Sequence, residues 1–119
     1  MNNVSLSGVI NTKDIVLRKT PSGLLVTSFL LKVKREFKKN FESNGNAYDY
    51  IKIVCWSGMA ELVVGQFKQG ATVMVSGSLR TDNRELKNYD VYDKEGNKKE
   101  NFQIPIVEVY AQHIEEVKK

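Results

Sequence analysis

The sequence contains one cysteine, one histidine and two prolines. One cysteine cannot form an internal disulfide, and together with one histidine it cannot complete a four-ligand zinc site or a cysteine–histidine nucleophile pair. A phosphate-binding glycine loop is also absent. Cys55 falls in an apolar row, so we interpret it as a small buried hydrophobe. We therefore expect no enzyme, no metal site and no cofactor.

Long apolar runs are missing as well. No stretch approaches the roughly 18 residues that cross a bilayer, and the opening MNNVSLSG lacks the basic and apolar regions of a secretory signal. The chain of 119 residues has the length of one domain. We expect a cytoplasmic protein without a membrane partner, with one domain at residues 1–114 and a short charged end at 115–119.

Positive charge is unevenly distributed along the chain. The net charge is +4, and the segment KVKREFKK at 32–39 carries all of this excess, because the rest of the chain has equal numbers of basic and acidic residues. A charge run is ordinarily a solvated face, and a nucleic-acid phosphate backbone is the leading functional alternative. The basic residues of the segment are Lys32, Lys34, Arg35, Lys38 and Lys39.

Hydrophobic alternation predicts strands at 4–10, 15–19, 24–37, 48–56, 71–80 and 102–114. Gly8, inside the first strand, indicates a bend or a close backbone approach, and Pro105 places part of the last strand at an edge or a bulge. A helix is predicted from a Ser57 cap to a Gly70 stop. Asn-Gly in the segment 40–46 predicts one hairpin, and the polar segment 81–101 predicts another around residues 95–97.

The order of these elements indicates the fold class. A helix between the third and fourth long strands is typical of a five-stranded, Greek-key OB-fold barrel. We therefore predict an all-β protein, a barrel with one helix and an extended hairpin between strands 4 and 5.

Strand 48–56 has two unlike faces. Ile51, Ile53 and Cys55 form an apolar row, whereas the other face carries aromatic and basic residues. A groove for single-stranded nucleic acid needs flat aromatic faces for bases and cations for phosphates, which explains such a face. A subunit interface and a second core layer are the competing interpretations. The residues of the outward face are Tyr48, Tyr50, Lys52, Val54 and Trp56.

Four stretches together resemble one family over essentially the whole chain. They are VSLSGVINTKDIVLRKTPSGLLVTSFLL, YDYIKIVCWSGMAELVV, GATVMVSGSLRT and VYAQHI. The chain resembles the bacterial-type single-stranded DNA-binding proteins, which have the OB-fold. The resemblance implies binding of single-stranded DNA with little sequence preference, in replication, recombination or repair, and a nucleoid-associated location.

Site residues follow from the resemblance position by position. It implies base stacking by Phe37, Tyr50 and Trp56. The family's third stacking aromatic falls on Arg84, which is not aromatic. Either Tyr89 or Tyr92 substitutes for it, or that stacking contact is absent. Folding of these two rings back onto the sheet is the alternative interpretation of Tyr89 and Tyr92. The candidate phosphate contacts come from the distribution of basic residues rather than from the resemblance, and they are Lys32, Lys34, Arg35, Lys38, Lys39, Lys52, Arg80 and Arg84.

The family also implies an assembly and a tail. Its members are usually homotetramers, with the first strand at a subunit contact, and they usually continue into a flexible region with an acidic tip. The chain ends at EEVKK instead, so we expect no recruitment of replication or repair enzymes by that route. Two rival functions remain: a dimeric primosomal accessory protein of the same fold, and an OB-fold module that binds only proteins.

Overall fold

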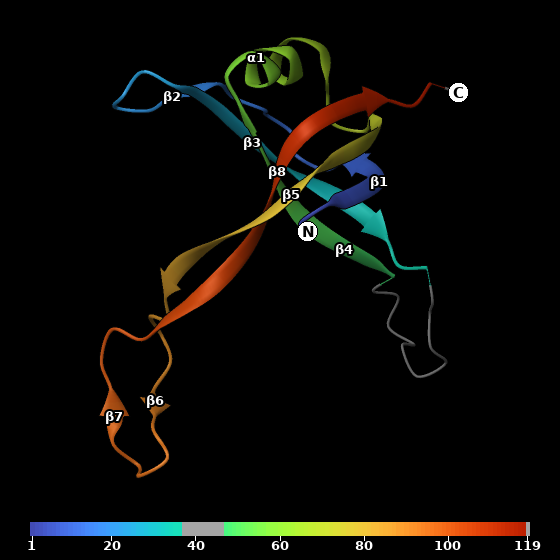
Figure 1. Ribbon diagram of the computed structural model, residues 1–119. Helices are drawn as coiled ribbons and strands as arrows, with labels where there is room; N and C mark the ends of the chain where they lie inside the picture. The colour runs from blue at the N-terminus through green and yellow to red at the C-terminus, as the bar shows by residue number, and fades with distance from the viewer. Residues whose placement is uncertain (37–46, 119) are drawn as a thin grey trace.

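The computed structural model describes residues 1–36 and 47–118 (Figure 1). Its fold is the predicted one, an all-β OB-fold with one helix. The main elements are β1 (Val4–Ile10), β3 (Leu25–Lys34), β4 (Tyr48–Trp56), α1 (Ser57–Gln66), β5 (Thr72–Glu85) and β8 (Gln103–Glu116). Three two-residue strands accompany them: β2 (Arg18–Lys19), β6 (Val91–Tyr92) and β7 (Lys98–Lys99). The predicted Asn-Gly hairpin of segment 40–46 lies outside the described residues.

The main sheet has the strand order β1-β5-β8-β4-β3-β2, and it closes because β1 also pairs with β3 at Val9 and Ile10. Most neighbouring strands are antiparallel. The exception is β4 against β8, which are parallel and pair at only two positions, Ile53 with Val109 and Val54 with Tyr110. The barrel is therefore weakly joined between β4 and β8, and that junction decides the shape of the site.

The interior is built from one face of each long strand. Leu31, Ile53 and Val73 have no exposed surface, and α1 adds Ala60 and Val63 to the same cluster. Burying such side chains is the main favourable contribution to folding. Cys55 lies in this core, and burial raises the pKa of its thiol to about 12. Its interpretation as a buried hydrophobe is confirmed.

Two glycines mark places where strands cross closely. A Cβ at Gly8 would overlap the carbonyl oxygen of Lys32, and one at Gly77 would overlap the carbonyl oxygen of Tyr110. The register of β5 against β8 shifts at Ser76 and Gly77, which is a bulge. The close approach predicted at Gly8 is confirmed, and Gly77 on the neighbouring strand β5 allows a similar approach to β8.

The helix differs from its prediction at both ends. Trp56 occupies the N-cap position without a side-chain cap, and Ser57 is the first helical residue, with a φ of 57°. The predicted Ser57 cap is wrong because β4 runs into α1 without a connecting residue. The helix ends at Gln66 rather than at Gly70. Gly70 lies in the following turn, where its N–H donates to the Ile10 carbonyl at 2.9 Å.

The predicted strand 15–19 shortens to Arg18–Lys19. Before it, the Val16 carbonyl accepts a hydrogen bond from the buried Thr27 hydroxyl at 2.7 Å, which fixes this segment through a side chain rather than a strand ladder. The predicted strand 24–37 is described as a strand only over Leu25–Lys34.

The predicted strand 71–80 is longer than expected. Instead of ending at residue 80, β5 continues to Glu85 against the first half of β8. The two strands leave the barrel as a twisted ribbon, which we call the arm, and it carries the β6–β7 hairpin (Figure 1). The hairpin tip is as predicted: the Asp93 carboxylate accepts the N–H groups of Glu95 and Asn97, and Gly96 has a φ of 85°.

Pro105 fits its predicted place. It lies in the half of β8 that pairs with β5 on one side only, opposite Asn83. A proline lacks the N–H that a central strand would need, so a strand with a free edge accepts it.

Candidate nucleic-acid interface

The candidate site lies on the outer face of β3, β4 and β8. Because side chains alternate along a strand, the inward row Ile51, Ile53 and Cys55 leaves Tyr50, Lys52 and Trp56 on the other face. The register places Leu30 beside Lys52 and Val26 beside Trp56. The alternation predicted for strand 48–56 is confirmed at these residues but not at Val54, which is only 6% exposed where β4 pairs with β8. The outer face carries aromatic rings and a cation together.

Trp56 lies beside an aromatic partner that the sequence reasoning missed. Its ring centroid is 6.1 Å from that of Tyr110, with the planes tilted by 48°. The two strands meet here because Val54 pairs with Tyr110. The Trp56 Nε1 is buried and has no hydrogen-bond partner among the described residues. The available signal was alternation in β8, where buried Val109 forces Tyr110 outward.

A hollow of about 370 Å³ opens over these rings, and we call it the Trp56 hollow. Arg18 and Lys19 from β2 lie on its wall, although neither was a predicted site residue. Arg80 also lies close, since its guanidinium carbon is 5.3 Å from the Tyr110 ring centroid. Cations beside aromatic faces are the combination that single-stranded nucleic acid requires.

A second hollow, of about 490 Å³, lies beside Tyr50, and we call it the Tyr50 hollow. Its lining is mainly apolar, with Leu30, Ile106 and Val107 among the contributors, and Arg84 from β5 also lines it. Tyr50 is 54% exposed. The fold therefore brings three predicted site residues together at this hollow: Tyr50, Lys52 and Arg84.

Further along β3, the cations lie in different surroundings. The Nζ of Lys32 is 4.2 Å from the centroid of the Tyr48 ring, close enough for a cation–π contact. Lys34 is exposed, and the register places it opposite Tyr48. Tyr48 had no predicted role, and the structure shows that its ring contacts a predicted phosphate ligand.

Two predicted cations already have carboxylate partners. Arg35 donates to both oxygens of Asp49, with its closest contact at 2.9 Å, and these hydrogen bonds hold the pKa of Asp49 below its ordinary value. Lys52 contacts Glu108 at 2.7 Å. Glu108 was not a predicted site residue, although it lines both hollows.

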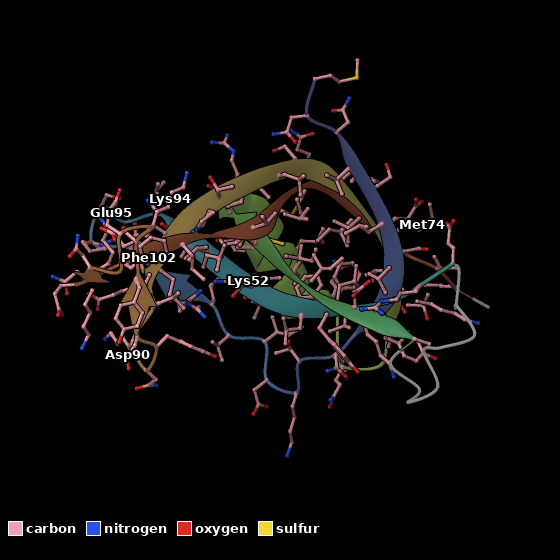
Figure 2. All side chains as sticks on the ribbon, turned by 90° about the horizontal axis from the view of Figure 1, so that it is seen from below. Lys52, Met74, Asp90, Lys94, Glu95 and Phe102 are labelled. Atoms are coloured by element: carbon pink, nitrogen blue, oxygen red, sulfur yellow. The ribbon has the colours of Figure 1, made fainter. Side chains whose placement is uncertain are left out.

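Tyr89 and Tyr92 belong to the arm rather than to either hollow. Both rings are exposed, so they do not fold back onto the sheet. Figure 2 shows the hairpin residues Asp90, Lys94, Glu95 and Phe102 gathered at one side of the molecule, whereas Lys52 lies near its middle. The remaining predicted residues, Phe37, Lys38 and Lys39, lie outside the described residues.

Over residues 1–36 and 47–118, no three residues among His, Cys, Asp and Glu form a group able to hold a metal ion. In the same ranges no helix has the length and apolar character to span a membrane.

Comparison with known proteins gives consistent matches. Residues 1–117 match the sequence profile of the "Single-strand binding protein family". Single-stranded DNA-binding protein 3 of Streptococcus agalactiae serotype V is 40% identical over 85 residues, which are 71% of this chain and 59% of that protein. A single-stranded DNA-binding protein of Streptococcus pyogenes serotype M1 is also 40% identical, over 50% of its length. The chain thus spans about half the length of the curated relatives it matches.

Proposed function

We propose that this chain, which belongs to the single-strand binding protein family, binds single-stranded DNA with little sequence preference. The observation that carries the proposal is the placement of Trp56 and Tyr50 beside two neighbouring hollows on one face. Aromatic rings accept the flat face of any base, so stacking gives affinity without base readout. The role is binding, not catalysis.

Stacking and phosphate contact are assigned to different residues. Tyr50 and Trp56 stack on bases together with Tyr110, and Phe37 is proposed from the family pattern. The exposed rings of Tyr89 and Tyr92 extend the interface along the arm. The phosphate contacts proposed on the described residues are Lys32, Lys34, Arg80 and Arg84, joined by Arg18 and Lys19, and those proposed outside them are Lys38 and Lys39.

The proposed process is protection of single strands during replication, recombination or repair, in the cytoplasm and at the nucleoid. The domain responsible is residues 1–114, and the short charged end at 115–119 has no proposed DNA contact.

We propose a homotetramer as the assembly. The outer face of β1, β5 and β8 supports it: Met74 is 51% exposed there, next to the small residues Ser5, Ser7 and Ser76. A large exposed apolar side chain beside small residues is suited to contact between copies, and His113 and Glu115 line the same hollow as these residues. Figure 2 shows Met74 on the opposite side of the molecule from the arm hairpin.

The test uses Trp56, the one tryptophan of the chain, as a fluorescent reporter. Titration with oligo(dT) at low salt should quench its emission, and added salt should reverse the quenching because phosphate contacts release counterions. Tyr50→Ala should weaken binding by about 1–3 kcal/mol, the usual contribution of one stacked base. Tyr50→Phe is the matched control and should bind like the natural chain.

Two results would contradict the proposal. One is unchanged Trp56 emission and unchanged mobility at micromolar oligo(dT). The other is Tyr50→Ala that disturbs assembly while leaving DNA affinity intact, which would favour a protein–protein module. A dimeric mass with DNA binding preserved would instead favour the primosomal accessory protein.

A further inference from the structure

The ion pair between Lys52 and Glu108 occupies the weak junction of the barrel. Lys52 precedes Ile53, and Glu108 precedes Val109, where β4 and β8 are paired in parallel. Lys52 and Glu108 lie one residue before the first paired positions of β4 and β8, so no backbone pairing joins the strands there. Their side chains join the strands instead, with the Lys52 Nζ 2.7 Å from a Glu108 carboxylate oxygen. Figure 2 shows Lys52 in the middle of the molecule.

This pair also lies between the stacking aromatics. Lys52 and Glu108 line both the Trp56 hollow and the Tyr50 hollow. Trp56 and Tyr110 contribute to the first hollow, and Tyr50 contributes to the second. A single strand whose bases stack on Tyr50 and on Trp56 must therefore pass the ion pair on its way.

The Lys52–Glu108 ion pair lacks the net positive charge that would attract a phosphate. The Glu108 side chain is 11% exposed and that of Lys52 is 45% exposed, so the ammonium is held against a carboxylate that is largely withdrawn from water. The pair is neutral as a whole. A phosphate offers only acceptors, and at Lys52 it would meet the Glu108 carboxylate at close range, where like charges repel.

The edge of a base has the complementary chemistry. Each base carries a hydrogen-bond donor beside an acceptor on its Watson–Crick edge, so it can donate to the carboxylate and accept from the ammonium at once. A phosphate can instead bind Arg80, which lies close by. Arg80 is the cross-strand partner of Glu108, and its guanidinium lies over the Tyr110 ring.

We propose that the Lys52–Glu108 pair receives the edge of a nucleobase and not a phosphate, which makes it a neutral hydrogen-bonding position between two stacking sites. This inference rests on the proposed binding of single-stranded DNA. It replaces the predicted phosphate contact of Lys52 and adds Glu108 to the interface.

The first test compares salt dependence in Lys52→Gln, Glu108→Gln and the double variant. Each phosphate contact on a single strand adds about 0.7 to the slope of log affinity against log salt. The double variant should keep the slope of the natural chain while binding more weakly. Glu108→Gln should steepen the slope by about 0.7 and bind more tightly at low salt, because it releases Lys52 as a free cation.

A slope that falls by about 0.7 in the double variant would make Lys52 a phosphate ligand and overturn the proposal. Arg80→Gln is the matched control. It removes a proposed phosphate contact, so the slope of log affinity against log salt should fall by about 0.7 in this variant. Thermal unfolding of every variant identifies any change that comes from the fold.

The second test needs no variant that might misfold. Oligo(dT) is compared with the same oligonucleotide built from N3-methylthymidine, which lacks the N–H that would donate to Glu108. The natural chain should bind the methylated strand about tenfold more weakly, as expected for loss of a hydrogen bond to a charged group. Deoxyuridine, which keeps this edge, is the control and should bind like thymidine.

Equal affinity for the methylated and unmodified strands would overturn the inference, since the pair would then only tie β4 to β8. That outcome is distinct from failure of the proposed function, in which unmodified oligo(dT) itself would not bind. In the double variant, the preference for the unmodified strand should fall below about twofold, because the charged acceptor is gone.

Discussion

At the scale of single residues, Ser57 shows how the site and the fold constrain one another. Trp56 is the last residue of β4 and Ser57 the first of α1, so the direction of the chain changes at one residue. Ser57 takes a φ of 57° to make that change, in the left-handed region where a Cβ is unfavourable. The strain lies next to Trp56, whose position on the face depends on how β4 ends.

Ser57→Gly should therefore stabilise the protein. Glycine adopts a positive φ without the Cβ penalty, and the expected gain is about 1 kcal/mol in the free energy of unfolding. Urea denaturation measures it, with Ser57→Ala as a control that keeps the Cβ and should show no gain. If Ser57→Gly is no more stable than Ser57→Ala, the backbone at residue 57 is not strained.

Two glycines, Gly77 and Gly65, should respond to alanine in opposite directions. Gly77→Ala would place a Cβ on the Tyr110 carbonyl, whereas a Cβ at Gly65 in α1 meets nothing within 4 Å. The first change should lower the free energy of unfolding by about 1–3 kcal/mol or more, through overpacking. The second should raise it by about 0.5–1 kcal/mol, through helix propensity. Urea denaturation of both variants measures these changes. Free energies of unfolding that change in the same direction in the two variants would contradict the prediction.

Residue-scale prediction of the site was partly successful for a physical reason. Alternation placed Tyr50, Lys52 and Trp56 on one face, because the period of a strand is local. It could not pair Lys52 with Glu108, or Trp56 with Tyr110, because those contacts join strands more than fifty positions apart. Which predicted cation has a carboxylate partner was therefore invisible in the sequence.

At the scale of elements, the ends of β3 and β4 are held by Arg35. Its guanidinium binds Asp49, and its backbone N–H donates to the Ala47 carbonyl at 2.7 Å. These contacts fix the base of the connection between the two strands. Because its guanidinium is engaged by Asp49, we propose no phosphate contact for Arg35, although it belongs to the basic segment.

Acid should weaken the contact between Arg35 and Asp49. Hydrogen bonds from Arg35 hold the pKa of Asp49 below its ordinary value in the folded chain. A lowered folded-state pKa contributes stability above the unfolded pKa, and that contribution is lost as the pH falls through the folded pKa. An NMR titration of the Asp49 carboxyl carbon should show its midpoint rising toward the ordinary value in Arg35→Met. An unchanged midpoint would mean that Arg35 does not act on Asp49 in solution.

The arm illustrates why element boundaries were harder to predict than elements. Residues 81–85 are polar and were assigned to a hairpin, yet they extend β5 against Gln103–Val107 of β8. Residues 81–84 are all polar and exposed, so the β5 half of the ribbon lacks the apolar alternation that identifies a strand, whereas the β8 half keeps it at Ile104 and Ile106. Its pairing comes from continuation of the ladder that begins in the barrel.

At the scale of the whole molecule, the arm makes the protein extended. The radius of gyration is 17.4 Å, above the roughly 13.5 Å expected for a compact chain of this length. The arm ends in exposed Tyr89 and Tyr92, and the face on β1, β5 and β8 exposes Met74. Surfaces of this kind are suited to contacts beyond one chain.

Met74→Glu should therefore break the proposed tetramer, because a carboxylate placed in an apolar contact must give up its hydration. Light scattering after gel filtration should show a smaller mass than for the natural chain. Leu24→Glu is the matched control, since Leu24 is also 51% exposed but lies in the turn before β3. Equal masses for the natural chain and Met74→Glu would contradict a contact at this face.

The sequence alone determined the class of fold, the position of the helix, and the two faces of strand 48–56. These depend on local periodicity and on the order of elements, both of which are written along the chain. Tertiary structure alone decided that Tyr110 joins Trp56, that Glu108 neutralises Lys52, and that β5 and β8 leave the barrel together. Each depends on strand register between distant segments, which the pattern along one strand does not specify.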